Sequence, residues 1–306
     1  MSSAVLIANP AASQFTGGMH RAAMRALARH NDVTAVWPRS PQESESMAAE
    51  AVDAGTEIVV AMGGDGVVHH VAQGLVNSSA VLGIVPVGTT NVLARILGAP
   101  AKPKKAVKIL SKGFSSKRVP TLHIEGRSFQ AEFTRSALFS LGVGADAAVV
   151  HAAEQDPLSK RSFGSLHYAR TAITTIRKDL RKRPATVTVT AGDRTLNGIG
   201  LLAQFHTVYS YFGRRPLILG DPDPIAVLVI EELKLRRVPK ILRSAGPRGD
   251  MGSIDGLTLW EDVESFEVHS STPVEVQADG ELLAGVTEMS VSFRPESLTV
   301  AVSPED

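Results

Sequence analysis

The residues best suited to chemistry lie in a glycine-rich loop, Gly63-Gly64-Asp65-Gly66, directly after a predicted buried strand at 58–62. Glycines let the backbone approach a ligand closely, and their N–H groups, with the start of the next helix, form an anion site. A carboxylate repels phosphate, so Asp65 needs a further explanation. It is accommodated if it holds Mg²⁺ through water or takes a proton from a reacting hydroxyl. The alternative is a tight glycine turn with a helix-capping aspartate.

A second loop follows a predicted strand at 81–85 and contains Gly88, Thr89 and Asn91. Both loops come at the carboxyl end of a strand, which is the edge where open α/β sheets bind ligands. Other phosphate-binding motifs fit poorly. The first loop lacks the third glycine of G-x-G-x-x-G, and the chain has no Gly-Lys pair for a Walker A loop.

Residues 63–74 and 83–98 resemble two motifs of the lipid kinases, namely the catalytic domains of diacylglycerol kinases and sphingosine kinases. The motifs are G-G-D-G-T-x-x-E-V-x-N-G and G-x-x-P-x-G-T-x-N-D-x-A-R-x-L-G. This sequence departs from them at Val67 for Thr, His70 for Glu and Val92 for Asp. The resemblance implies that both loops bind ATP. It assigns nucleotide contacts to Asn9, Ser40, Gly63, Gly64, Asp65, Gly66, Val67, Gly88, Thr89 and Asn91.

Three of these assignments have a simpler competing explanation. The Asn9-Pro10 pair, which matches the family's first strand, is also typical of a plain turn. Ser40 stands three residues before Glu43, the spacing of a capping box at the start of a helix. Asp65 itself could be only a cap.

Two further segments resemble later family motifs. Residues 139–147 are similar to N-x-x-G-x-G-x-D-A, which implies that Asp146 joins Asp65 in organising Mg²⁺ and water; the alternative is a helix cap at Asp146. Residues 276–281 are similar to v-q-x-D-G-E. Asp-Gly alone predicts a hairpin turn. The resemblance adds Glu281 as the general base for the substrate hydroxyl, with Asp65 as the second candidate.

The pattern of elements predicts two domains of different class. Strands alternate with helices up to about residue 112, which indicates a parallel sheet with helical crossovers. Short strands follow, so we expect an α/β + β fold: a Rossmann-like nucleotide-binding domain at 1–117, then a β-rich lipid-binding domain at 118–294. The strand near 295–306 is expected to return to the first domain. The resemblance implies a β-sandwich for the second domain and an active site in the cleft between the two.

The patterns predict these elements in detail. Helices are expected at 17–30, 41–54, 147–154 and 164–182, with a short helix opened by Pro103. In the second domain, strands are expected at 119–125, 128–133, 137–143, 186–190 and 195–205, with a turn at Gly192-Asp193. A linker is expected at 113–116.

The charge is unevenly distributed along the chain. The net charge is +1, but residues 249–306 contain 13 acidic residues and one basic residue, so residues 1–248 carry +13. Residues 102–118 include seven basic residues and no acidic one. This run indicates either a solvated face or a surface facing anionic lipid. The partners we expect are a lipid substrate and an anionic membrane, with no nucleic acid, and a homodimer is left open.

The cysteine content and the distribution of apolar residues indicate where in the cell the protein is expected. The chain has no cysteine, which excludes a disulfide framework and a thiolate metal site. The N-terminal residues lack the basic start of a signal peptide, and no apolar run approaches the ~18 residues of a membrane span. We therefore expect a cytoplasmic protein that associates peripherally with membrane.

The resemblance implies an ATP-dependent lipid kinase that uses Mg²⁺ and transfers the γ-phosphate to a lipid hydroxyl. Diacylglycerol, a sphingoid base and a polyprenyl-type alcohol all remain open as substrates. One alternative is an enzyme like NAD kinase, although that family's Thr-Gly-Ser-Thr-Ala-Tyr type of segment is absent. The other is an inactive lipid- or nucleotide-binding protein, because Val67 removes a hydroxyl and His70 removes a carboxylate.

Overall fold

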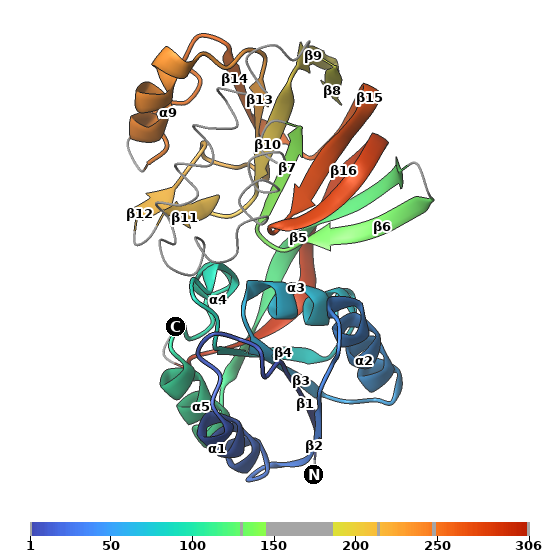
Figure 1. Ribbon diagram of the computed structural model, residues 1–306, viewed down its shortest axis with the longest axis vertical. Coiled ribbons are helices and arrows are strands. Elements are labelled where there is room, and N and C mark those ends of the chain that lie inside the picture. Colours follow the sequence, from blue (N-terminus) through green and yellow to red (C-terminus); the bar gives the residue numbers. More distant parts are fainter. Residues whose placement is uncertain (1, 129–130, 145–185, 213–214, 247–248, 305–306) are drawn as a thin grey trace. The chain divides into compact units, whose positions relative to one another are not determined.

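The computed structural model describes residues 2–128, 131–144, 186–212, 215–246 and 249–304. Asp146 and the helices expected at 147–154 and 164–182 lie outside these residues. The chain forms two compact units, one made of residues 1–121 and 295–306 and the other of residues 122–294. Figure 1 shows the elements of both.

The first unit is a parallel sheet with helical crossovers. Strand β1 pairs with β2 and β3, β3 pairs with β4, and the C-terminal part of β16 pairs with β4, all in parallel. The elements are β1 (Ser2–Ala8), α1 (Gly17–Leu27), β2 (Asn31–Val36), α2 (Pro41–Asp53), β3 (Ile58–Gly63), α3 (Asp65–Gln73), β4 (Val81–Pro86), α4 (Val92–Ile96) and α5 (Pro103–Lys112).

Helices cover both faces of this sheet. Helices α1 and α5 share one core with alternate residues of β1 and β3, while α2 and α3 pack together on the opposite face (Figure 1). Strand β3 is buried along its whole length, as expected for a strand with helices on both sides. The layers therefore leave the carboxyl ends of β1, β3 and β4 as the edge where the glycine loops begin.

Local sequence signals explain where α2 starts and stops. The Ser40 hydroxyl accepts a hydrogen bond from the Glu43 N–H at 3.1 Å, and the Glu43 carboxylate accepts one from the Arg39 N–H. Pro41 fits the first turn, where an N–H is not needed. Gly55 has a φ of 79°, the left-handed conformation that commonly ends a helix. The expected cap at Ser40 is confirmed.

The second unit is built from antiparallel strands. Its elements are β5 (Ser115–Ser128), β6 (Glu132–Ala137), β7 (Ser140–Gly144), β8 (Val187–Ala191), β9 (Arg194–Gly198), β10 (Gly200–Gln204), β11 (Ser210–Phe212), β12 (Arg215–Leu217), β13 (Ile225–Ile230), η2 (Leu235–Arg237), α9 (Val238–Ser244), β14 (Leu257–Val263), β15 (Ser265–Ala278) and β16 (Glu281–Val302). Strands β5 and β16 also extend into the first unit.

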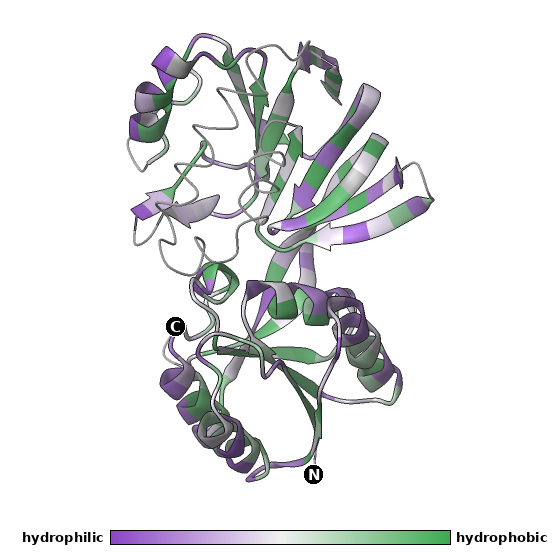
Figure 2. Ribbon diagram, in the orientation of Figure 1, coloured by the Kyte–Doolittle hydropathy of each residue, from purple (hydrophilic) through white to green (hydrophobic). Residues whose placement is uncertain are grey.

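Alternate residues of the second unit's strands point into one core. Leu122, Val189, Leu201, Val227 and Val276 come from five strands and have almost no exposed area. Figure 2 shows the resulting alternation of apolar and polar residues along the strands. The expected order of a parallel α/β part followed by a β-rich part is confirmed.

Both expected hairpin turns are present. Gly192-Asp193 joins β8 to β9, with Ala191 opposite Arg194. Asp279-Gly280 joins β15 to β16, with φ values of 58° and 90° at its two residues. Positive φ at both central positions is the geometry of the turn that Asp-Gly favours in hairpins.

Four boundary predictions are wrong. Helix α1 ends at Leu27, three residues before the expected end. The linker expected at 113–116 is interrupted by β5, which begins at Ser115, and the strand expected at 195–205 is two strands on either side of Ile199. The strand expected at 128–133 is not one strand, because β5 ends at Ser128 and β6 begins at Glu132, and the Ser128 N–H bonds to the Ala131 carbonyl at 3.0 Å. Gly113, Gly198 and Gly200 stand near two of these boundaries, but a glycine in a strand pattern does not by itself show where the strand breaks.

A fifth wrong boundary has a specific cause. The strand expected at 137–143 begins only at Ser140, because β6 ends at Ala137 and residues 138–139 form a bend. The N–H groups of Leu138, Phe139 and Ser140 bind the Asp279 carboxylate and are not available to a neighbouring strand. In the part of the chain that the structure describes, no helix is long and apolar enough to span a membrane.

Candidate active site

The first glycine loop leads directly from β3 into α3. Gly64 is the N-cap of α3 and supplies no side-chain hydrogen bond to it. The first N–H groups of a helix have no partner within the helix, so an uncapped start presents them to a ligand. The loop therefore has the backbone arrangement that an anion requires.

The glycines of the two loops lie against each other. A Cβ added at Gly88 would come within 2.6 Å of the Gly64 Cα, and one added at Gly63 within 2.5 Å of the Val67 Cβ. Real Cβ atoms do not tolerate such distances, so Gly63 and Gly88 are required by packing. Val67, at the family's Thr position, is half-buried against Gly63.

Asp65 connects the two loops. Its Oδ1 accepts a hydrogen bond from the Leu93 N–H at 2.9 Å, and its Oδ2 accepts one from the Thr90 hydroxyl at 3.2 Å. Leu93 lies in the first turn of α4, so Asp65 caps a helix other than its own. The capping alternative thus accounts for part of the carboxylate's role. Its role toward a metal ion or a proton stays a prediction.

Asn91 fixes the shape of the second loop. It has a left-handed backbone conformation, with a φ of 48°. Its side chain accepts from the Gly88 N–H and donates to the Gly88 carbonyl, both at 3.0 Å. Asn91 is 8% exposed, whereas Thr89 beside it is exposed. The buried amide therefore holds the loop while Thr89 faces outward.

The loop after β1 completes this edge of the sheet. The Asn9 side chain accepts the Ala11 N–H at 2.9 Å, and the Asn9 N–H donates to the Met62 carbonyl at the end of β3. Ser13 lies 3.1 Å from the Thr89 hydroxyl, and the Gln14 side chain donates to the Gly88 carbonyl at 2.8 Å. No sequence motif singles out Ser13 or Gln14, although both follow the carboxyl end of a strand.

His70, at the family's Glu position, is 7% exposed and lies beside a carboxylate from another helix. Its Nδ1 is 3.5 Å from Glu45 Oε2 on α2. The neighbouring ring of His69 packs edge-on against it, with centroids 5.2 Å apart. An imidazole with a carboxylate neighbour thus replaces the family's carboxylate at this position.

Ser40 is exposed, and among the described residues its hydroxyl bonds to the Glu43 N–H as the cap of α2 described above. A nucleotide contact from Ser40 stays a prediction.

The second unit holds the late acidic motif. Glu281 is half-buried at the start of β16, directly after the Asp279-Gly280 turn. Asp279 is 6% exposed and accepts the Leu138, Phe139 and Ser140 N–H groups at 2.7, 2.8 and 3.1 Å. The Gln277 side chain accepts the Gly280 N–H at 2.8 Å. The turn that carries Glu281 is therefore held by two buried side chains whose roles the sequence did not reveal.

The described residues fit a magnesium ion only through Asp65. Asp146, the other expected ligand, lies outside the described residues. Among the residues that the structure does describe, no three His, Asp or Glu side chains gather as a metal cluster. Mg²⁺ at phosphoryl-transfer sites is usually held by one or two carboxylates together with substrate phosphates and water. A single carboxylate in an anion-binding loop is consistent with that donor set.

The family model of the diacylglycerol kinase catalytic domain matches residues 3–120, which include both glycine loops. A relative named "Probable lipid kinase YegS-like" from Stenotrophomonas maltophilia is 27% identical over 248 residues, covering 78% of this chain and 77% of the relative. Residues 3–120 are therefore similar to a diacylglycerol kinase catalytic domain, and most of the chain is similar to a protein named as a lipid kinase. A Mycobacterium tuberculosis protein named diacylglycerol kinase is 38% identical over 97 residues, which span 31% of each chain.

Solved structures of Bacillus anthracis proteins described as diacylglycerol kinases share the fold. A Bacillus anthracis diacylglycerol kinase structure has a TM-score of 0.70 at 17% identity and covers 99% of this chain and 98% of its own. A second structure from the same organism reaches a TM-score of 0.75 at 18% identity with the same coverage. At this identity the likeness supports the architecture alone.

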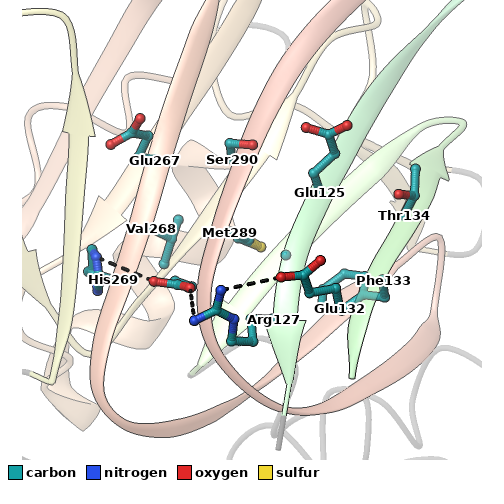
Figure 3. A pocket seen from close by; sticks show the side chains of 12 residues that line it. Glu125, Arg127, Glu132, Phe133, Thr134, Glu267, Val268, His269, Met289 and Ser290 are labelled. Atoms are coloured by element: carbon teal, nitrogen blue, oxygen red, sulfur yellow. Dashed lines mark hydrogen bonds and ion pairs between the residues drawn. The ribbon is translucent and has the colours of Figure 1, made fainter. Parts of the chain in front are cut away.

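A hollow of about 530 Å³ lies elsewhere, on the second unit's sheet (Figure 3). Arg127 reaches Glu132 at 3.3 Å and Glu288 at 3.2 Å across neighbouring strands. None of the expected site residues lines this hollow. Its charged pairs have the arrangement of ordinary cross-strand contacts on a solvated sheet face.

Proposed function

We propose that this protein is an ATP-dependent lipid kinase that transfers the γ-phosphate of ATP to a lipid hydroxyl. The observation that carries the proposal is Asp65, a carboxylate that joins two glycine loops at the carboxyl edge of a parallel sheet. The match of residues 3–120 to the diacylglycerol kinase catalytic domain, and the similarity to a protein named as a lipid kinase, support a kinase acting on lipid. The acceptor is a diacylglycerol-like or sphingoid lipid in this proposal.

The chain's own residues would bind and orient the phosphates. The uncapped start of α3 offers N–H groups to phosphate oxygens. Asn91 keeps the second loop in a fixed conformation, so little ordering is needed when ATP binds. Phosphoryl transfer depends on positioning and charge neutralisation more than on covalent chemistry, so rigid loops of this kind suit it.

Asp65 and Asp146 would hold Mg²⁺, which neutralises negative charge on the phosphates when bound. Asp65 is already fixed by two hydrogen bonds, so its direction is set before any ion arrives. A carboxylate oxygen accepts more than one interaction, which leaves Asp65 capacity for an ion or a water.

Glu281 would be the general base for the lipid hydroxyl, and Asp65 is the second candidate for that role. The Asp279-Gly280 turn fixes the start of β16, and Glu281 is the first residue of that strand. Asp-Gly is enough to form a hairpin turn. The turn therefore does not account for the glutamate that follows, and a chemical role would account for it.

The test is transfer of radiolabel from γ-labelled ATP to a panel of lipids: a diacylglycerol, a sphingoid base and a polyprenyl alcohol, with NAD as the water-soluble alternative. We expect label on one of the lipids and none on NAD. Label on NAD alone would favour the NAD kinase alternative. Binding of ATP or of a lipid, with no label transferred to any acceptor, would favour an inactive lipid- or nucleotide-binding protein.

Asp65→Asn tests, in the same assay, whether the carboxylate that joins the two glycine loops is needed for transfer. We expect it to abolish transfer while the fold persists, because the amide oxygen can still accept the Leu93 N–H. Thr90→Val is the matched control, since it removes one of the Asp65 hydrogen bonds and keeps the carboxylate. If Asp65→Asn retains activity within about twofold of the wild type, a chemical role for Asp65 is excluded.

A further inference from the structure

Helices α1 and α5 lie side by side on one face of the first unit's sheet (Figure 1). The His30 ring, just past the end of α1, lies 3.4 Å from the Ser111 carbonyl on α5. Both helices bury their inner sides in the same core, through Ala26 and Leu27 on α1 and Ala106 and Leu110 on α5. Their outer sides therefore form one rigid, outward-facing layer.

This layer is strongly basic. Arg21 and Arg25 of α1 and Arg29 in the turn that follows it are exposed at intervals of four residues, the spacing of one side of a helix. The exposed cations at α5 are Lys102, Lys104, Lys105, Lys108 and Lys112. We call these eight residues the α1–α5 basic face.

Neither α1 nor α5, both of which lie within the described residues, contains an acidic residue. Residues 1–31 and 66–124 contain no Asp or Glu at all, so the first unit's acidic residues lie only at 32–65 and in the segment 295–306. Within the described residues, none of the eight cations forms an ion pair. The two helix layers of one small sheet thus differ sharply in charge, and the cations on one of them are available to an outside anion.

An exposed tryptophan stands beside the same layer. Trp37 follows β2 and is 44% exposed, and its ring contacts His20 of α1, with centroids 4.5 Å apart. Burial, with a smaller contribution from Arg21, lowers the pKa of His20, so this ring adds no charge at neutral pH. An exposed tryptophan next to cations is the combination found where proteins meet the headgroup region of a bilayer.

We propose that the α1–α5 basic face docks the protein onto an anionic phospholipid membrane. The inference rests on the proposed function, because a kinase with a lipid acceptor must reach a bilayer. Lysine side chains suit this role, since their apolar stems can follow the lipid surface while the ammonium groups meet the phosphates. A nucleic acid would also attract the cations, but a lipid acceptor gives it no part in the reaction.

The test is co-sedimentation with vesicles of phosphatidylcholine alone and of phosphatidylcholine with phosphatidylglycerol. We expect binding only to the anionic vesicles, weakening as salt is raised. The triple variant Lys104→Gln, Lys108→Gln and Lys112→Gln should lower the vesicle partition coefficient by about 100-fold, following the typical contribution of each basic residue near such a surface. Its unfolding temperature should match the wild type, because all three side chains are exposed.

A matched control removes the same charge elsewhere. Lys234, Arg236 and Lys240 belong to the basic segment around η2 and α9 in the second unit. Changing these three to Gln should leave vesicle binding within about threefold of the wild type. If this control loses binding while the α5 variant keeps it, the α9 segment is the membrane contact and the proposal is overturned.

Trp37 reports the contact directly. Trp260, the other tryptophan of the chain, is 8% exposed. Vesicles of phosphatidylglycerol with brominated phosphatidylcholine should therefore quench wild-type fluorescence, and Trp37→Phe should remove that quenching. If wild type binds anionic vesicles but Trp37 is not quenched, a different face is docked and the proposal is wrong.

Two further measurements distinguish membrane docking from the proposed kinase activity and from nucleic-acid binding. Co-sedimentation requires no turnover, so it tests the face even if no lipid is phosphorylated. With substrate dissolved in neutral detergent micelles, the α5 variant should turn over at the wild-type rate, and on anionic vesicles it should be slower. If the wild type binds double-stranded DNA through the same lysines and does not bind vesicles, the face serves nucleic acid and the membrane proposal falls.

Discussion

Asp279 and Glu281 lie two residues apart at the same hairpin, yet their surroundings differ. Asp279 is buried and accepts three backbone N–H groups, whereas Glu281 is half-buried at the start of a strand. A buried carboxylate with that many donors is a structural anchor, since removing its charge leaves N–H groups poorly paired. Asp279 would thus act on catalysis only by holding the turn that carries Glu281.

Paired substitutions separate the two roles. Asp279→Asn should lower the free energy of unfolding by about 1.5–3 kcal/mol, the usual worth of hydrogen bonds to a charged group, as measured by chemical denaturation. Glu281→Gln should leave stability unchanged and lower turnover by about 10²–10⁴-fold, the usual contribution of a general base. ATP affinity should hardly change in Glu281→Gln, because the base touches the lipid hydroxyl.

Two results would contradict this assignment. Survival of turnover in Glu281→Gln would make Asp65 the better candidate base. Loss of ATP binding together with turnover would place Glu281 in the metal network, away from proton transfer.

At the scale of elements, substitutions of Ser40 at the start of α2 distinguish a helix cap from a contact with the nucleotide. The hydroxyl caps the helix, so Ser40→Ala should cost about 1 kcal/mol of stability in a denaturant titration. Asp is an equally good cap, so Ser40→Asp should restore that stability. If the hydroxyl also touches the nucleotide, Ser40→Asp should raise the KM for ATP while stability stays normal. An unchanged KM in both variants would leave capping as the whole role of Ser40.

The sequence predicted the elements that local chemistry determines. The cap at Ser40, the end of the helix expected at 41–54 and the Asp279-Gly280 hairpin each depend on residues within a few positions, so the residue types were enough to predict them. The boundary near residue 138 was wrong because Asp279 binds that backbone from more than a hundred residues away. The hydrogen bond between Asp65 and Leu93 was missed for the same reason, because no local pattern shows which N–H a carboxylate will meet.

At the scale of the whole molecule, the end of the chain returns to the first unit. Thr299 and Val300 of β16 pair in parallel with Val81 and Leu82 of β4. The Asn77 N–H donates to the Ser297 carbonyl at 2.7 Å, and Leu298 beside it has no exposed area. The first unit therefore depends on residues that are far in sequence from the rest of it.

Leu298→Ala tests this dependence. Deleting a fully buried leucine side chain typically costs about 2–5 kcal/mol, because the site collapses only in part. We expect the loss in the first unit, where hydrogen exchange should show lower protection for amides of β1, β3 and β4. Leu201→Ala is the matched control, since Leu201 is equally buried in the core of the second unit, and its loss should appear in β10 and β13. The cores around β3 and around β10 share no residue, which is why the two effects should separate. If both variants lower protection equally in both units, the chain unfolds as one cooperative body and the division into two units has no thermodynamic meaning.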